Sequence, residues 1–331
     1  MKKIKIAIID TGCSTKLLNQ SRNIIYDEKL QLSVNKYNIN EIEDNIGHGT
    51  MCIKNIMNKL KGYENLVYIY LIKIFNNIGI TSSKNLVEVL YKINKKDIDI
   101  INISLSTTDQ LMRNEFNKIC SLLTKQGKLI IASKTYKGDD EAILSIPATL
   151  DCTIGIDGSM DYNDDEFDIF WDSKIDLVFN SKKYLYILDD HIDDFGLNSR
   201  ATSLATAFIT KLIIDNNISI ISKDIVINEL SKHRTTKKNR VNNFKKRLKK
   251  TGANILLNIQ YILNTLNIKT TIYEMIYTNM IFEFFYYNNE KLLDFIYQID
   301  YRFNIDINLE KYSTEEICNV FKLVDIIEQH M

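Results

Sequence analysis

The chain has 331 residues, of which 45% are hydrophobic and 25% are charged, as in ordinary soluble globular proteins. This length holds one large domain or two and allows a substantial core. Acidic and basic residues balance at 42 each, so no net charge favours a nucleic acid or a membrane as partner.

The cysteines and the N-terminus both predict a cytoplasmic protein. The apolar run Ile4–Ile9 is too short for the core of a signal peptide, so we expect neither a signal peptide nor a propeptide. No later stretch reaches about 18 uncharged apolar residues, and we expect no transmembrane span. The five cysteines are odd in number and form no CxxC pair, which favours reduced thiols: Cys13, Cys52, Cys120, Cys152 and Cys318.

Short apolar runs alternate with amphipathic stretches through the first two-thirds of the chain. This alternation predicts an α/β fold in which helices flank a parallel sheet. The expected strands are Ile4–Ile9, Leu66–Ile72, Ile98–Ser104, Lys128–Ala132, Cys152–Ile156 and Ile175–Phe179. The expected helices are Met51–Lys61, Ser83–Asn94, Asp109–Gln126, Thr202–Asn216 and Ser222–His233.

Three positions in tight turns carry side chains suited to acyl transfer. Asp10 ends the first strand, His48 lies between two glycines, and Ser203 is expected to open a helix. Each has a plainer interpretation, since Asp and Ser often cap helices and a His between glycines can be structural. Together they supply the orienting acid, the base and the nucleophile that hydrolysis of a peptide needs. Open α/β sheets build such sites at the carboxyl ends of their strands.

The segments around these positions resemble, in chain order, the Asp, His and Ser motifs of the subtilisin family of serine peptidases. They are Ile8-Ile9-Asp10-Thr11-Gly12, Gly47-His48-Gly49-Thr50 and Ala201-Thr202-Ser203-Leu204-Ala205. The resemblance implies a subtilisin-like domain over residues 1–235, in which Asp10 orients His48 and His48 deprotonates Ser203. In the third motif, Ala201 stands where the family has Gly and Leu204 where it has Met.

A further segment resembles the strand against which subtilisin-family substrates lie extended. Asn102-Ile103-Ser104-Leu105-Ser106 matches the family's Asn-Met-Ser-Leu-Gly. Peptides bind such an edge by main-chain hydrogen bonds, with side-chain pockets giving selectivity. The resemblance therefore implies substrate contacts at these residues: Ser104, Leu105, Ser106, Ala132 and Ser133.

The oxyanion hole departs from the family. Tyr136 falls where the family has an Asn whose amide stabilises the tetrahedral intermediate, and removing such a donor costs about 10²–10³ in kcat. The candidate replacements are the Tyr136 hydroxyl, Lys134 and Ser133, with the amide of Ser203 as the second donor. Weak catalysis is one expectation, and a catalytically impaired protein that binds a peptide or partner protein without cleaving it is the alternative.

Residues 236–251 form a predicted basic linker. Ten of the nineteen residues from Lys232 to Lys250 are Lys or Arg and none is acidic, which is typical of a solvated linker. A docking surface for an acidic partner is the other interpretation.

Residues 252–331 predict a small all-α bundle, which we expect to bind a partner protein. Its helices are Ile255–Leu266, Lys291–Phe303 and Thr314–His330. The order of elements loosely resembles an acyl carrier protein, but the position of that family's phosphopantetheine Ser falls near Asn288-Asn289-Glu290. No Ser lies between Ser231 and Ser313, so we expect no phosphopantetheine, and a plain four-helix bundle is the alternative.

Taken together, these patterns predict a cytoplasmic serine endopeptidase that processes a precursor or leader peptide. We expect no cofactor, because no GxGxxG or GxxxxGK[ST] motif follows a predicted strand. We expect no metal at His48, because no HxxxH motif or Cys/His cluster accompanies it. Calcium at the acidic stretch Asp161–Asp168 is possible but is not indicated, since the regular ligand spacing is missing.

Overall fold

The computed structural model describes residues 2–32, 42–135, 145–170, 174–188, 192–234, 250–272, 275, 280–285 and 288–331. The chain divides into two compact units. The first unit contains Met1–Ser181 and Gly196–Thr236, and the second contains Lys182–Phe195 and Lys237–Met331. The division at Thr236 lies beside the expected domain boundary, whereas the assignment of Lys182–Phe195 to the second unit was not expected. Most of the predicted linker lies outside the described residues.

The described part of the first unit is built on an eight-stranded sheet in the order β2-β3-β1-β4-β5-β6-β8-β7. All neighbouring strands pair in parallel except β7 and β8. Each of the six predicted strands is present, and the two additional strands, β2 and β7, are only three residues long. The strands are β1 (Ile4–Asp10), β2 (Ile24–Tyr26), β3 (Val67–Lys73), β4 (Ile100–Ile103), β5 (Leu129–Ser133), β6 (Ile154–Ser159), β7 (Phe167–Ile169) and β8 (Leu177–Asn180).

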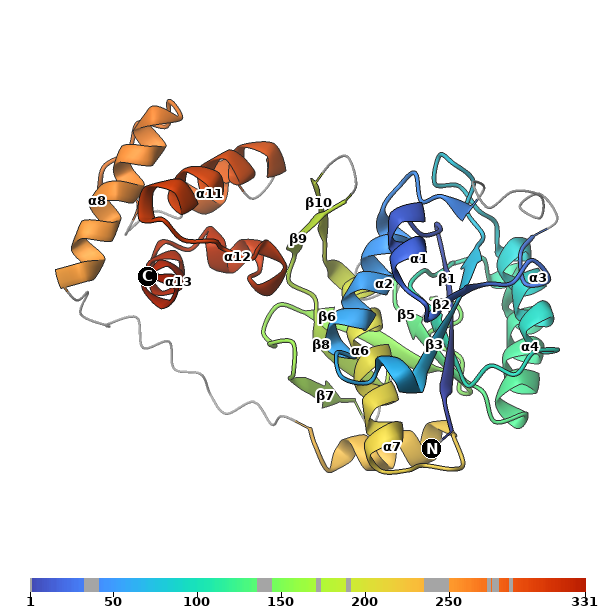
Figure 1. Ribbon diagram of the computed structural model, residues 1–331. Helices are drawn as coiled ribbons and strands as arrows, with labels where there is room; N and C mark the ends of the chain where they lie inside the picture. The colour runs from blue at the N-terminus through green and yellow to red at the C-terminus, as the bar shows by residue number, and fades with distance from the viewer. Residues whose placement is uncertain are drawn as a thin grey trace. The chain divides into compact units, whose positions relative to one another are not determined.

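Helices cover both faces of this sheet, as Figure 1 shows. Along β1, Ile6 and Ile8 face one core while Ala7 and Ile9 face the other, because successive side chains of a strand point to opposite faces. Burial on both sides explains why the strands read as continuous apolar runs. One core is covered by α1 (Thr15–Gln20), α2 (His48–Lys59), α6 (Leu197–Asp215) and α7 (Lys223–Ser231), and the other by α3 (Ser83–Ile93) and α4 (Arg113–Lys125).

The start of α6 differs from the prediction. The helix begins at Leu197, with Gly196 as its N-cap, rather than at Thr202. Leu197 has a φ of 57°, a left-handed conformation that costs a residue with a Cβ about 1–2 kcal/mol. Its amide donates to the carbonyl oxygen of Ser181 at 2.8 Å, which helps to hold this turn. Ser203 therefore lies in the second turn of the helix, and the prediction that it opens the helix is wrong.

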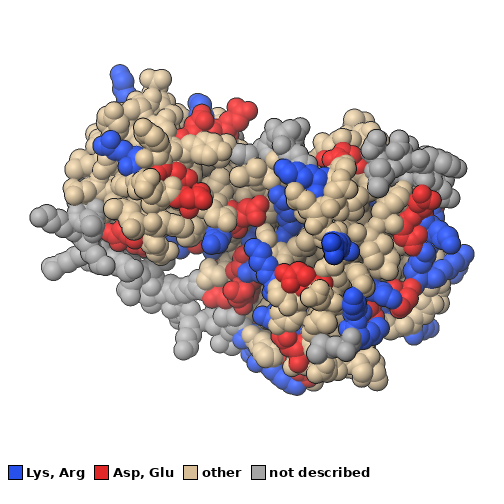
Figure 2. Space-filling model, in the orientation of Figure 1, with Lys and Arg blue, Asp and Glu red and all other residues tan. Residues whose placement is uncertain are grey.

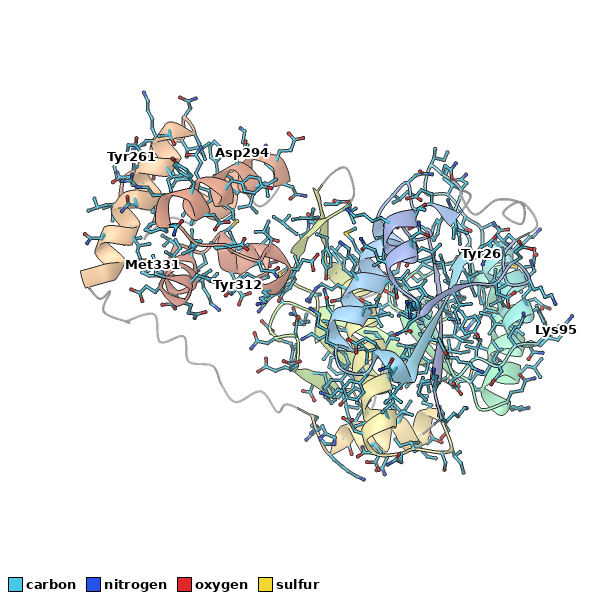
Figure 3. The ribbon with its side chains drawn as sticks, in the orientation of Figure 1. Tyr26, Lys95, Tyr261, Asp294, Tyr312 and Met331 are labelled. Carbon is cyan, nitrogen blue, oxygen red and sulfur yellow. The ribbon has the colours of Figure 1, made fainter. Side chains whose placement is uncertain are left out.

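The second unit combines a β-hairpin with helices. In the hairpin, β9 (Tyr184–Ile187) pairs antiparallel with β10 (Ile192–Phe195). Leu185 is fully buried and belongs to the core that the helices form. Figure 3 marks α8 by Tyr261 and α11 by Asp294. The described helices are α8 (Lys250–Thr265), α10 (Met280–Phe285), α11 (Asn289–Phe303), α12 (Thr314–Ile317) and α13 (Val320–His330).

The last predicted helix, Thr314–His330, is interrupted. It divides into α12 and α13, because the Asn319 side chain accepts hydrogen bonds from the amides of Phe321 and Lys322 and caps a new helix. The resemblance to an acyl carrier protein stays a prediction.

Charged side chains of both signs are interspersed on the visible face of the protein (Figure 2), in line with its net charge of zero. Among the described residues, no helix has the length and apolar character needed to cross a membrane.

Candidate active site

The predicted acid and base meet at the carboxyl end of β1. Asp10 is the last residue of β1 and is fully buried. His48 is the first residue of α2, whose N-cap Gly47 has a φ of 86°, a value that favours glycine. The distance from His48 Nδ1 to Asp10 Oδ1 is 2.7 Å. This hydrogen bond fixes the orientation of the imidazole and leaves Nε2 as the nitrogen for proton transfer.

A second carboxylate secures the turn that carries His48. Asp44 Oδ1 accepts hydrogen bonds from the Thr11 hydroxyl at 2.7 Å and from the Gly47 amide at 2.9 Å. Its Oδ2 accepts from the amide of Thr50, also at 2.7 Å. A Cβ on Gly49 would lie 2.3 Å from the carbonyl oxygen of Gly12. Only glycine therefore lets α2 start this close to the turn after β1.

Electrostatics in this cluster favour the protonated imidazole. Burial alone would lower the pKa of His48, but the Asp10 carboxylate, with smaller effects from Cys52, raises the pKa well above its usual value. Asp10 Oδ2 is buried and has no hydrogen-bond donor among the described residues. The attraction between the Asp10 carboxylate and the protonated His48 is therefore only weakly screened. Proton abstraction needs the neutral form, so the raised pKa shifts the range in which His48 acts as a base toward higher pH.

Cys52 lies one helical turn after His48 and faces the same cluster. Its Sγ is 3.9 Å from His48 Nδ1. Burial, with the nearby Asp10 charge, raises the pKa of the Cys52 thiol to about 12. The thiol therefore stays protonated at physiological pH and is not a competing nucleophile, because the thiolate is the reactive form.

These three residues also form a Cys/His/Asp cluster that the sequence did not reveal. Ligand atoms of Asp10, His48 and Cys52 all lie within 4.8 Å of one another. Two atoms bound to the same tetrahedral zinc at ~2.0 Å would lie about 3.3 Å apart. The 2.7 Å between His48 and Asp10 instead fits a shared proton. The chemistry of this cluster is therefore that of a base and its orienting acid.

The predicted nucleophile Ser203 is not part of this cluster. It is fully buried between α6 and α2. Its Oγ accepts a hydrogen bond from Asn55 Nδ2 at 2.6 Å and donates to the carbonyl oxygen of Arg200 at 2.9 Å. The bond from Asn55 ties α2 to α6, and the bond to Arg200 lies within α6. These contacts favour a packing role for Ser203, and its assignment as the nucleophile stays a prediction.

Ser199 is a second serine of α6, four residues before Ser203. It lies in the first turn of α6 and is partly exposed. Its Oγ donates to the carbonyl oxygen of Ser104 at 3.0 Å. The Ser104 side chain lowers the pKa of the Cys52 thiol, and Cys52 Sγ lies 3.9 Å from His48 Nδ1. Ser104 therefore connects the surroundings of Ser199 with those of the Asp10–His48 pair.

One spacing occurs twice in this helix. Ser-x-Ala occurs as Ser199-Arg200-Ala201 and again, four residues later, as Ser203-Leu204-Ala205. Gly196, which ends the preceding loop, is the signal that identifies the first copy as the start of the helix. Glycine is accepted at an N-cap, whereas Ala201 and Thr202 lie inside the helix.

The expected substrate strand divides into exposed and buried residues. Leu105 and Ser106 follow β4 and are partly exposed, and their backbone groups make no hydrogen bond within the described residues. Ser104 is buried, and its carbonyl oxygen accepts the hydrogen bond from Ser199. Ala132 and Ser133 belong to β5 and are also buried, with Ala132 paired to Ile103. Leu105 and Ser106 therefore form an open edge, whereas Ala132 and Ser133 are enclosed.

The oxyanion hole is only partly visible. Tyr136 lies outside the described residues. Lys134 Nζ is held by Asp157 at 2.8 Å, and the Ser133 hydroxyl donates to the carbonyl of Lys134, so both predicted replacements are engaged elsewhere. The amide of Ser203 belongs to the helical interior, which corrects that expectation as well. By contrast, the amides of Asn198 and Ser199 have no acceptor among the described residues and lie at the positive end of α6.

The residue after Ser199 anchors the helix start. Arg200 is buried, and its Nη2 lies 2.8 Å and 2.9 Å from the two carboxylate oxygens of Asp164. Burial alone would raise the pKa of Asp164, but Arg200 and Lys59 hold it below its usual value. In the acidic stretch considered for calcium, this carboxylate therefore already neutralises a buried guanidinium.

Gly158 of β6 packs closely against Asn198, the residue before Ser199, and leaves no room for a side chain. A Cβ on Gly158 would lie 2.5 Å from Ser181 Cβ and 2.6 Å from Asn198 Oδ1. We expect Gly158→Ala to lower the free energy of unfolding by about 1–3 kcal/mol through overpacking and to reduce activity by displacing Asn198. Urea unfolding and peptide turnover measure the two effects.

Adding Ser181→Gly to that variant removes the nearer clash and is the matched control. It is expected to restore part of the stability. Equal stability of Gly158→Ala and wild type would show that this packing does not constrain the turn.

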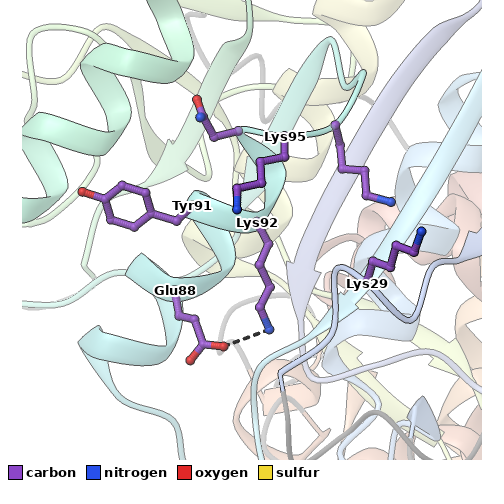
Figure 4. A pocket seen from close by; sticks show the side chains of 7 residues that line it. Lys29, Glu88, Tyr91, Lys92 and Lys95 are labelled. Carbon is purple, nitrogen blue, oxygen red and sulfur yellow. Dashed lines mark ion pairs between the residues drawn. The ribbon is translucent and has the colours of Figure 1, made fainter.

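A cavity of about 640 Å³ lies at α3 and shares no residue with the site described above (Figure 4). Within it Glu88 and Lys92 form an ion pair at 2.8 Å. The cavity is mainly basic, and it is lined by Lys29, Glu88, Tyr91, Lys92, Asn94, Lys95 and Lys96.

Comparison with known proteins agrees with the fold and the motifs. A solved structure of a cold-adapted subtilisin-like serine proteinase is 16% identical, with a TM-score of 0.53 over 69% of this chain and 80% of that one. A lanthipeptide protease is 13% identical, with a TM-score of 0.53 over 68% of this chain and 78% of that one. No curated protein matches the chain.

The predicted subtilisin-like α/β fold is thereby confirmed. The family model described as the Subtilase family matches residues 1–214. Because this match spans more than half of the 331 residues, and because the sheet carries the family's acid and base where its motifs placed them, the chain belongs to the subtilase family of serine peptidases.

Proposed function

We propose that this subtilase is an active serine endopeptidase whose triad is Asp10, His48 and Ser199. The observation that carries the proposal is the 2.7 Å hydrogen bond between Asp10 and His48, with Ser199 joined to the same cluster through Ser104. A buried acid, a base oriented by it and a hydroxyl at a helix start are the parts that acyl transfer needs.

In the proposed reaction, His48 Nε2 takes the proton of Ser199 while Oγ attacks the substrate carbonyl carbon. Without substrate, the Ser199 hydroxyl donates that proton in a hydrogen bond to the carbonyl oxygen of Ser104, so a rotation about the Cα–Cβ bond of Ser199 precedes attack. His48 then gives the proton to the leaving amine, the peptide bond breaks, and an acyl-enzyme remains. Water, deprotonated by His48, releases the acyl group and restores Ser199.

The tetrahedral intermediate places a negative oxygen near the start of α6. The Ser199 amide, which lacks an acceptor among the described residues, is the proposed first donor. The positive end of the helix adds to its effect. Tyr136 stays the candidate for the second donor.

Substrate selection is proposed to use the open edge at Leu105 and Ser106. An extended peptide adds to such an edge by main-chain hydrogen bonds, as in other cases of strand addition. We further propose that the enzyme works in the cytoplasm on a precursor or leader peptide, since unselective digestion there would harm the cell. The likeness of its fold to a lanthipeptide protease supports this class of substrate. The second unit is proposed to bind a partner protein.

Incubating peptides encoded beside this gene with the protein tests the proposal. Mass spectrometry is expected to find defined cleavage products with wild type and none with Ser199→Ala. Tight binding of a peptide by both proteins, without cleavage by either, would instead establish a subtilase that only binds.

A further inference from the structure

The hairpin β9–β10 joins the second unit to the turn that carries Ser199. The chain leaves the first unit after Ser181 and returns at Gly196. Both ends of this excursion are fixed in the first unit, because the Leu197 amide donates to the carbonyl of Ser181 at 2.8 Å. The Ser181 amide donates in turn to the carbonyl of Ser159 at 3.1 Å.

The hairpin itself is held by the helices of the second unit. The carbonyl oxygen of Lys183 accepts from the Thr314 amide at 2.7 Å and from the Thr314 hydroxyl at 2.9 Å. Tyr184 forms a β-bridge with Ser313. Leu185 is fully buried in the apolar core that the helices form. The hairpin is therefore an integral part of the second unit.

Only three residues separate this hairpin from Ser199. Phe195, which pairs with Tyr184 in the ladder, is followed by Gly196, Leu197 and Asn198. Leu197 is in the unfavourable left-handed conformation, so the turn needs outside support to persist. The hydrogen bond between Ser181 and Leu197 supplies part of this support. The β9–β10 ladder, which ends at Phe195, limits how far residues 196–198 can move.

We infer that the second unit is a positioning element for catalysis, because Thr314 and Leu185 hold the hairpin and the hairpin holds the turn of Ser199. This inference rests on the proposed role of Ser199. None of these residues touches the reacting atoms. Releasing the hairpin is expected to let the turn relax and to move Oγ away from the attacking position.

The test compares two double variants of the full chain. Leu185→Ala with Thr314→Val removes the apolar contact and the hydroxyl donor that hold the hairpin. The matched control, Leu263→Ala with Thr265→Val, makes the same chemical changes within α8. There Leu263 is buried in the same core, and the Thr265 hydroxyl contacts Ile262 of its own helix and Gln298 of α11, away from the hairpin.

Hydrogen exchange of peptides covering Gly196–Ser203 is the first measurement, because it needs no catalysis. The hairpin variant is expected to exchange about tenfold faster there than the control, the effect of roughly one lost buried hydrogen bond. Its kcat is expected to fall about tenfold or more with KM little changed, since a shift of ~1 Å costs on the order of 10²-fold. Thr314→Ser, which keeps the hydroxyl, is expected to behave as wild type.

Several results would overturn the inference. Equal exchange at Gly196–Ser203 in both double variants would show that the hairpin does not hold this turn. Equal loss of kcat in both would assign the effect to the second unit as a whole. If the hairpin variant loses its fold, Thr314→Val alone provides the same comparison with Thr265→Val. An inactive wild type with the expected exchange difference would refute the proposed function while supporting the hairpin's structural role.

Discussion

Ser199→Ala is expected to abolish peptide cleavage, with kcat lower by about 10⁶-fold, the size of effect that loss of a catalytic Ser has in the family's type member. The reason is that Ser199 lies at the exposed start of α6 and contacts the strand end beside His48. A fluorophosphonate probe is expected to add to Ser199 in wild type and to leave Ser199→Ala unmodified. Intact-protein mass and peptide mapping measure this directly.

Ser203→Ala is the matched control, since it removes the same hydroxyl one helical turn later. It is expected to keep probe labelling and most of the activity. Its free energy of unfolding is expected to fall by about 1–3 kcal/mol, because Asn55 loses the acceptor that Ser203 provides. Labelling that disappears in Ser203→Ala but persists in Ser199→Ala would reverse the assignment.

Asp10→Asn is expected to lower kcat by about 10⁴-fold, as in other Ser-His-Asp peptidases, because the amide favours the wrong imidazole tautomer. It also removes the charge that raises the pKa of His48. In wild type, kcat/KM is expected to fall with decreasing pH as His48 becomes protonated, with a midpoint above the usual 6.5 of histidine. In Asp10→Asn that midpoint is expected to lie at lower pH, since the protonated form loses its partner.

Asp176→Asn serves as the control for loss of a half-buried carboxylate, just before β8. Asp176 binds the Gly155 amide and Lys223, distant in the sheet from His48. The variant is expected to leave the acid limb of the pH profile unchanged. An unchanged midpoint in Asp10→Asn as well would show that Asp10 does not control the protonation of His48.

The sheet and the acid–base pair were predictable, because both depend on local patterns. Continuous apolar runs specify strands buried on both faces, and glycines around His48 specify a sharp turn. Which serine lies at the exposed helix start was not predictable, since Ser199 and Ser203 share the spacing to a following Ala. Only the position of Gly196 against the rest of the fold decides where α6 begins.

The hairpin was also not predictable from the sequence. Its strands have four residues each and lie in an acidic stretch, so the apolar pattern is weak. Leu185 is buried in a core formed with helices distant in sequence, whereas the ring of Phe195 packs against Tyr186 within the hairpin. The helical residues of the core that contains Leu185 begin at Ile255, far along the chain, so no local pattern indicates them.

Because the hairpin belongs to the second unit, it can fold only after the sheet of the first unit during synthesis. Domains form as their residues emerge, N-terminal parts first, at ~5–20 residues per second. The sheet can assemble once its last strand has emerged. The core that buries Leu185, however, also contains Ile327, which is synthesised much later. Peptidase activity is therefore expected to arise only after Ile327 has been synthesised, well after the sheet and its acid–base pair.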